Sequence, residues 1–246
     1  ADMAKNMDEA HFKDMGGTKL ADMAKNMDGD HFKEMGGLNI AEMAKNMDEA
    51  HFKDMGGQKL AHMAKNMAGD HFKEMGGLNI AEMTNAMDIT SIGTIGNEQV
   101  KNMTKTMGKD NLSTLGSGKI VGLAKGIKSE EILEIGADNL FTMVETIKED
   151  DVTSLGDSHL SSMMSGIQGE QIRQLTETKK VSIVNNLEAN FFGANSTKFE
   201  EINDERSDVE RPTIAQEKVG TTKIAQSGKT AGFFSIKNLF AKRQQQ

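Results

Sequence analysis

The sequence predicts an all-α protein, an α-solenoid of 20-residue, two-helix repeats. Three observations lead to this prediction. Large apolar residues recur every 20 positions from residue 1 to about 192, without an insertion or deletion. Within each unit they are spaced three or four residues apart, as on one face of a helix. Glycine recurs in most units at the point where one of the two helices would end.

The unit at 28–47 shows how the repeat resolves into two short helices. Phe32 and Met35 share one helical face, after Asp28 at the position of an N-cap. The pair Gly36-Gly37 then provides a helix stop. Helices of this length are marginal when isolated in water, so neighbouring units must pack on each other. Residues after the glycine are expected to cap the next helix: Thr18, Asn97, Ser117, Asp138 and Ser158.

The units change along the chain while their register holds. Residues 1–83 are nearly identical at a 40-residue superperiod, and 3–17 and 43–57 are the same string. Further on, Ile and Leu replace Met at the same positions, so we interpret the methionines as core residues. Residues 1–192 hold about nine and a half units. The chain opens in mid-repeat without a polar cap, and 176–192 is expected to form a C-terminal cap.

The rest of the chain has a different composition. Residues 193–231 are predicted to be a polar, charged linker, and 232–246 a basic amphipathic segment. Six Lys and Arg and no acidic residue lie in 218–246, so the net charge of −8 leaves −14 on the part of the chain before Lys218. An acidic array disfavours nucleic acid as a partner. With no Cys, a disulfide framework and a thiolate zinc site are excluded.

The C-terminal segment is the candidate docking site. Phe233, Ile236 and Phe240 follow helical spacing, and basic residues form the other side. The segment would dock in a partner's groove; a membrane surface and packing back on the solenoid are the alternatives. The candidate docking residues are Phe233, Phe234, Ile236, Lys237, Leu239, Phe240, Lys242 and Arg243.

Catalytic and metal chemistry find little support in the sequence. The series His11, His31, His51 and His71 looks like a ladder of ligands, but stacked helices lie about 8–10 Å apart, too far for adjacent histidines to share an ion. A weak site combining His31 with Asp28 or Asp30 is the alternative. The recurring aspartates are better explained as caps. We therefore expect no enzyme, no catalytic or metal-binding residue and no cofactor.

The alternation of short helices, with apolar pairs such as Phe32 and Met35 and a capping Asp or Gly between them, resembles the superhelical N-terminal domain of MgtE-type magnesium transporters. It also resembles the armadillo-like region of the flagellar rotor switch protein. This resemblance covers 1–192 and implies a superhelical helix array; no functional residue of either family transfers to this sequence.

The expected function is a non-catalytic scaffold or spacer in a larger assembly, anchored by the C-terminal segment to a protein partner, with a membrane-associated complex among the options. One alternative is a divalent-cation-responsive regulatory domain. Another is a self-stacking filament, a homo-oligomer formed through the uncapped N-terminal repeat. The expected location is the cytoplasm, with no nucleic acid bound.

Overall fold

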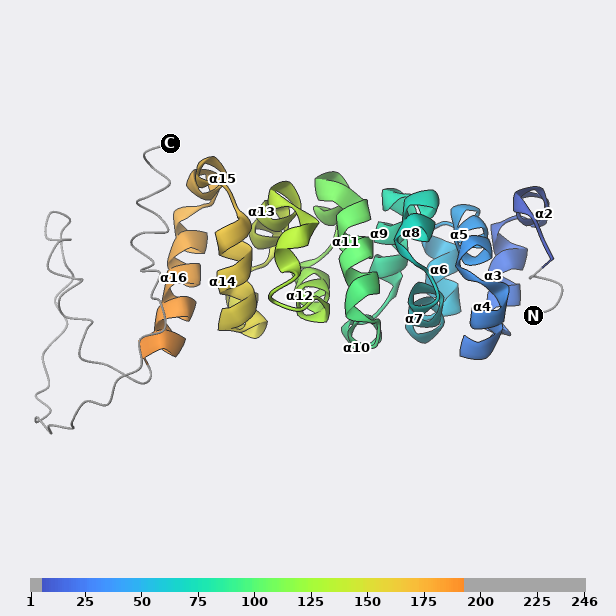
Figure 1. The fold of residues 1–246 in the computed structure, drawn as a ribbon, viewed down its shortest axis with the longest axis horizontal. Coiled ribbons are helices and arrows are strands. Elements are labelled where there is room, and N and C mark those ends of the chain that lie inside the picture. Colours follow the sequence, from blue (N-terminus) through green and yellow to red (C-terminus); the bar gives the residue numbers. More distant parts are fainter. Residues whose placement is uncertain (1–5, 193–246) are drawn as a thin grey trace, which may run out of the picture. The chain divides into compact units, whose positions relative to one another are not determined.

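The computed structural model describes residues 6–192, with side chains to 187. The chain divides into two units, 1–187 and 188–246, and the fold below is that of the first. Within the described residues every regular element is a helix and none is a strand, which confirms the prediction of an all-α protein. The helices follow one another in chain order along the first unit (Figure 1).

Each 20-residue unit contributes a short helix and then a longer one. The short helices are α2 (Glu9–Met15), α4 (Gly29–Met35), α6 (Glu49–Met55), α8 (Gly69–Met75), α10 (Ile89–Gly93) and α15 (Gly169–Gln174), with the 3-10 helices η1 (Ile132–Ile135) and η2 (Glu149–Leu155) in the same role. The longer helices are α3 (Gly17–Lys25), α5 (Gly37–Lys45), α7 (Gly57–Lys65), α9 (Gly77–Ala86), α12 (Ser117–Gly126), α13 (Ala137–Thr146) and α14 (Asp157–Gly166). α11 (Asn97–Leu112) joins a long and a short helix at a kink at Gly108. α16 (Glu177–Phe192) spans the expected C-terminal cap.

Aspartate and glycine define the helix ends as the sequence predicts. The Asp28 side chain accepts a hydrogen bond from the backbone N–H of His31, and Asp8, Asp48 and Asp88 cap their helices in the same way. Gly36 has φ +82° between α4 and α5, a conformation that a residue with a Cβ rarely adopts. One residue therefore serves as both the C-cap of α4 and the N-cap of α5.

The expected second set of caps is wrong. The longer helices begin directly after glycine, and the N-cap is that glycine, which has no side chain to accept a hydrogen bond. The five residues lie inside the helices: Thr18, Asn97, Ser117, Asp138 and Ser158. Their side chains instead make hydrogen bonds with residues 29–34 positions away, such as Asn97 with Glu131.

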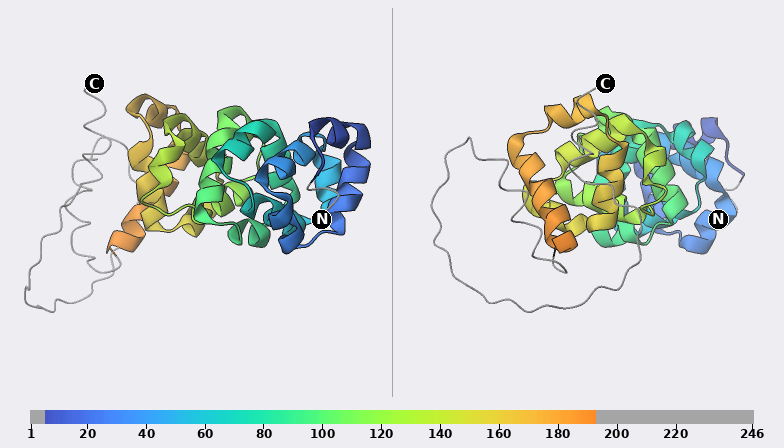
Figure 2. Two further views of the ribbon diagram at one scale, coloured as in Figure 1. Left: turned by 45° about the vertical axis from the view of Figure 1, so that its right-hand side comes forward. Right: turned by 60° about the vertical axis from the view of Figure 1, so that its left-hand side comes forward.

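From α2 to η1, each helix packs on the third helix further along the chain, with α11 counted as two helices. α2 packs on α5 and α5 on α8; α3 packs on α6 and α6 on α9; α4 packs on α7 and α7 on α10. Three consecutive helices therefore form one layer, and successive layers stack into three columns, one for each of these series. With α11 counted as two helices, the pattern continues through η1, α13, η2 and α14. Figure 2 shows the stack from two further directions.

The core lies between the layers. Phe12, Phe32, Phe52 and Phe72 are fully buried, and the Met positions that follow them become Ile or Leu without loss of burial. Each sequence unit thus contains two helices, whereas each layer of the structure contains three. Equivalent residues of consecutive units consequently lie in different columns.

Candidate functional site: polar contacts between layers

The candidate docking residues at 233–243 lie outside the described residues, so the structure leaves that prediction open. The described unit offers instead a set of polar contacts that join one layer to the next. These contacts have a regular spacing along the chain, and they form the candidate site described below.

The histidines of the first units belong to helix caps. The backbone N–H of Asp28 donates to Nδ1 of His31 at 3.2 Å, and the backbone N–H of His31 donates to Oδ1 of Asp28 at 3.0 Å. This arrangement closes a reciprocal capping box, repeated at His11 and His51. Neighbouring histidines lie in different columns, because α2, α4 and α6 do. They form no ladder, although His31 and Asp28 do meet.

The same histidine position also contacts the neighbouring layer. His51 packs on Gly17 of the layer before it, and a Cβ built on Gly17 would lie 2.5 Å from Cε1 of that ring. Later in the chain the same two repeat positions carry polar pairs. Asn97 Nδ2 donates to Glu131 Oε2 at 2.9 Å, and Ser117 Oγ donates to Asp151 Oδ2 at 2.5 Å. The partners thus change together along the chain, from glycine and imidazole to two polar side chains.

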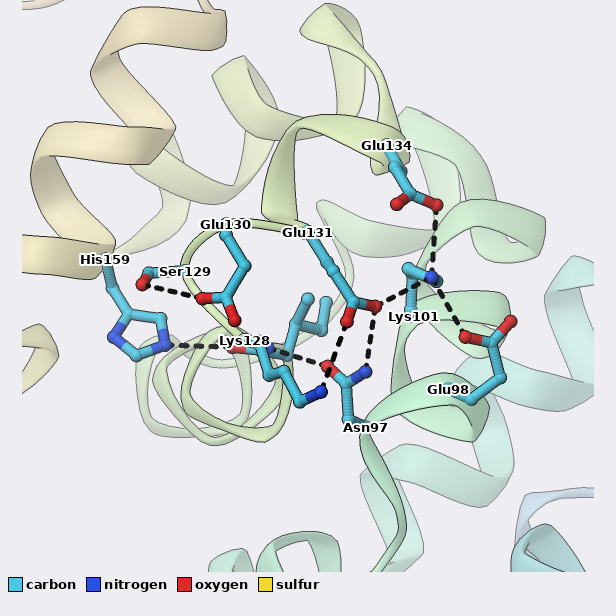
Figure 3. A network of polar contacts seen from close by, with 10 residues as sticks. Asn97, Glu98, Lys101, Lys128, Ser129, Glu130, Glu131, Glu134 and His159 are labelled. Atoms are coloured by element: carbon cyan, nitrogen blue, oxygen red, sulfur yellow. Dashed lines mark hydrogen bonds and ion pairs between the residues drawn. The ribbon is translucent and has the colours of Figure 1, made fainter.

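Lys101 is the centre of the most extensive of these contacts (Figure 3). Its Nζ lies 2.9 Å from Glu98 in the same helix, 2.9 Å from Glu131 and 3.0 Å from Glu134 in the next layer. Only 10% of the Lys101 side chain is exposed. The equivalent residue one unit earlier is Ala81. Lys101 therefore replaces a small core residue with a cation that is held between two layers.

Asn97 and Lys128 complete this network on the other side of Glu131. The backbone N–H of Lys128 donates to Asn97 Oδ1 at 2.6 Å, and Lys128 Nζ lies 3.4 Å from Glu131 Oε1. The Asn97 amide, followed by Lys101, lowers the pKa of Glu131 to about 2. Hydrogen bonds from Glu131, Glu98 and Glu134 raise the pKa of Lys101. Both groups are charged at neutral pH, and their attraction holds the two layers together.

A second charged cluster lies in the first column. Lys45 Nζ lies 2.6 Å from Glu74 and 3.8 Å from Glu9, which belong to the layers on either side. Glu42 is buried beside it, with Oε1 3.6 Å from Lys45 and Oε2 without a hydrogen-bond partner. Burial raises the pKa of Glu42; Lys45 offsets part of this rise, and Glu9 and Glu74 add to it. Lys45 thus links three layers, whereas Glu42 opposes the fold when it is ionised.

The remaining candidates for chemistry are few among the described residues. A cavity of about 190 Å³ near the C-terminal end is lined by Glu145, Glu149 and Lys179 among others. Lys179 Nζ lies 3.8 Å from Glu149, and burial lowers its pKa. No group of three or more His, Asp and Glu in the described part is arranged to hold a metal ion. None of the described helices combines the length and apolar character needed to cross a membrane.

Comparisons with known proteins return nothing: no family model, no curated protein and no solved structure matches this chain. The likeness to the transporter domain and to the rotor protein therefore stays an expectation from the sequence. The role of the side chains must come from their contacts alone. These contacts join layers through hydrogen bonds and ion pairs.

Sequence reasoning missed Lys101 and the pairing of the repeat positions of Gly17 and His51. Both left a signal. Lys101 interrupts a run of alanines at its repeat position, namely Ala21, Ala41, Ala61 and Ala81. The pairing shows in the sequence as a joint change: where the Gly17 position becomes polar, the His51 position changes as well. This signal can be interpreted only when the stacking of three helices per layer is known.

Proposed function

We propose that residues 1–192 form an α-solenoid that acts as a non-catalytic spacer in a larger assembly. The observation that carries this proposal is the packing of each helix on the third helix along the chain. Such packing supports an array in which every layer contacts only its neighbours, so that length and direction follow from the number of units.

The distribution of side chains also supports a spacer. Among the residues whose side chains are described, the recurring apolar residues are nearly all buried. The large apolar side chains exposed in that part of the chain come from five different helices or turns: Leu38, Leu78, Ile89, Leu133 and Val181. Scattered apolar residues are normal on a protein surface and do not mark a binding face. The inter-layer ion pairs of Lys45 and Lys101 fix neighbouring layers against each other.

The anchor in this proposal is the amphipathic segment at 232–246, outside the described residues. Phe233 and Phe240 would enter an apolar groove of a protein partner, and Lys237 would face its acidic rim. The proposed location is the cytoplasm.

Partner capture from the source of the protein tests this function. Three chains are used as bait: the full chain, a chain ending at Gln216, and the full chain with Phe233→Ala and Phe240→Ala. The spacer proposal expects a defined partner set with the full chain only. Retention of the same set by all three chains would place binding on the helices and reject the anchor.

A cation-responsive regulator is the second candidate, and one observation favours it. The Glu42 carboxylate is buried with one oxygen that lacks a hydrogen-bond partner, a single acceptor and, among the described residues, not a set of metal ligands. A rise in thermal midpoint above about 2 °C on adding Mg²⁺ or Ca²⁺, lost in Glu42→Gln, would support it. No shift would favour the spacer.

A further inference from the structure

The repeat in the sequence and the layer in the structure have different sizes. Each sequence unit supplies two helices, one short and one longer. A layer takes three helices, because α2 packs on α5 and α3 packs on α6. The column of a given repeat position therefore changes with every unit.

Three units are needed before a position returns to its column. α2, α4 and α6 carry the same repeat positions, yet they lie in the first, third and second columns respectively. α8, which follows α2 by three units, lies in the same column as α2, because α2 packs on α5 and α5 on α8. One unit thus turns the chain by two thirds of a circuit about the stack, and three units complete two layers.

The contacts between layers permit units to be added or removed in the first part of the chain. Gly17 meets His51, and Gly37 meets His71 in the same way. Lys45 pairs with Glu74 as Lys25 pairs with Asp54, at the same spacing along the chain. Because residues 3–17 and 43–57 are the same string, a copied unit meets the residues that the original meets.

From these observations we propose that the number of repeats sets the angle between the two ends of the array as well as their separation. This inference rests on the proposed spacer function, since an angle between the ends matters only when both ends are held. Adding or losing one unit turns whatever is attached by two thirds of a circuit. Only the addition or loss of three units leaves the angle between the two ends unchanged.

Distances between spin labels test this angle in the full chain. The chain has no Cys, so an introduced cysteine is labelled uniquely. Lys13, Lys33 and Lys53 are exposed, equivalent positions on α2, α4 and α6, one for each column. Ser154 on η2 is exposed and shares its column with Lys33 through α7, α10 and α12. Pairs of Ser154→Cys with a cysteine at each of these lysines are made in chains with zero to three extra copies of 48–67 placed after Met67.

The expected result is a rotation of Ser154 through the three columns. One extra unit brings Ser154 into the column of Lys53, two into that of Lys13, and three back to that of Lys33. The Lys33–Ser154 distance then grows in unequal steps. After three units the distance has grown by about 16–20 Å, the depth of two layers at 8–10 Å each. More than half of that growth comes with the first unit, because Ser154 then also moves to another column.

Equal steps of about 8–10 Å per unit would overturn the inference and leave the spacer intact, because each unit would then form a layer of its own. A broad distance distribution in the chain without insertions would reject the rigid spacer and the angle with it. Far-ultraviolet circular dichroism confirms that each inserted chain keeps its helix content. A second series, with copies of 28–47 placed after Met47, repeats the Lys33–Ser154 measurement at a different junction.

Discussion

His51 occupies the space that a Cβ on Gly17 would need, although the two residues lie in different layers. A Cβ on Gly17 would also lie 2.8 Å from the backbone carbonyl of Asn46. Close approach between layers therefore depends on glycine at this position for steric reasons, although its φ is one that any residue adopts. Any larger residue at position 17 should separate the two layers.

Gly17→Ala should destabilise the fold by about 1–3 kcal/mol, because a backbone carbonyl cannot move aside as a side chain can. Gly29→Ala is the matched control. Gly29 is also the first residue of its helix, but the three atoms nearest to an added Cβ all belong to the His62 ring, the first at 2.8 Å. The control should be neutral or gain up to about 1 kcal/mol from helix propensity. Urea unfolding measures both, and an equal effect of the two changes would contradict the contact.

Asp28→Ala should lower the thermal midpoint by about 2–4 °C, because the N-cap hydrogen bond to His31 is lost. Ala68 allows the reverse substitution, because it occupies the N-cap position of α8 and has no side-chain acceptor. Ala68→Asp should therefore raise the midpoint by a similar amount. Calorimetric scans of the two variants test this symmetry. A lower midpoint for Ala68→Asp would show that capping does not explain the recurring aspartate.

Lys101→Ala should lower the thermal midpoint at pH 7 by about 3–6 °C, since three glutamates lose their common cation. Alanine fits, because it stands at the equivalent positions in earlier units. Lys105→Ala in the same helix is the control; Lys105 is exposed, and no ion pair involves its side chain among the contacts described above. An equal loss in both variants would rule out the network as its cause.

The effect of Lys101→Ala should also depend on pH. The pKa of Glu131 in the fold is about 2, below its ordinary value of 4.5. Ionised Glu131 therefore stabilises the fold above pH 4.5, and this contribution is lost as the pH falls toward 2. The difference in midpoint between the parent and Lys101→Ala should shrink over that range. A difference that stays constant down to about pH 2.5 would show that packing, and not charge, explains the loss.

Glu42→Gln should raise stability at pH 7, because the buried carboxylate has an unpartnered oxygen and two glutamates nearby. Burial raises the pKa of Glu42, so its protonated form is the one that the fold favours. The penalty appears as the pH rises through that pKa and is absent below 4.5, the ordinary value for glutamate. The gain should be about 2–4 °C at pH 7 and vanish near pH 4. A gain of equal size at both values would contradict this account.

The sequence was sufficient for what depends on neighbouring residues. The Phe32–Met35 spacing, the Asp28 cap and the Gly36 stop are local patterns, and each is found in the structure. The layer of three helices was not predictable in this way, because it depends on contacts between different units, whereas the periodicity reports only the unit itself. The same limit explains why Thr18 and Ser117 were expected to cap helices: their partners lie in the next layer.

The central claim is that the helical array acts as a spacer and that the C-terminal segment binds the partner. Cross-linking of the full chain with its captured partner tests this claim most directly. A lysine-reactive cross-linker followed by mass spectrometry locates the points of contact. The claim predicts links from the partner to Lys237 and Lys242, and links within the chain for lysines of the helices, such as Lys45. Links from the partner spread over the lysines of residues 6–187, with none at 237 or 242, would contradict it.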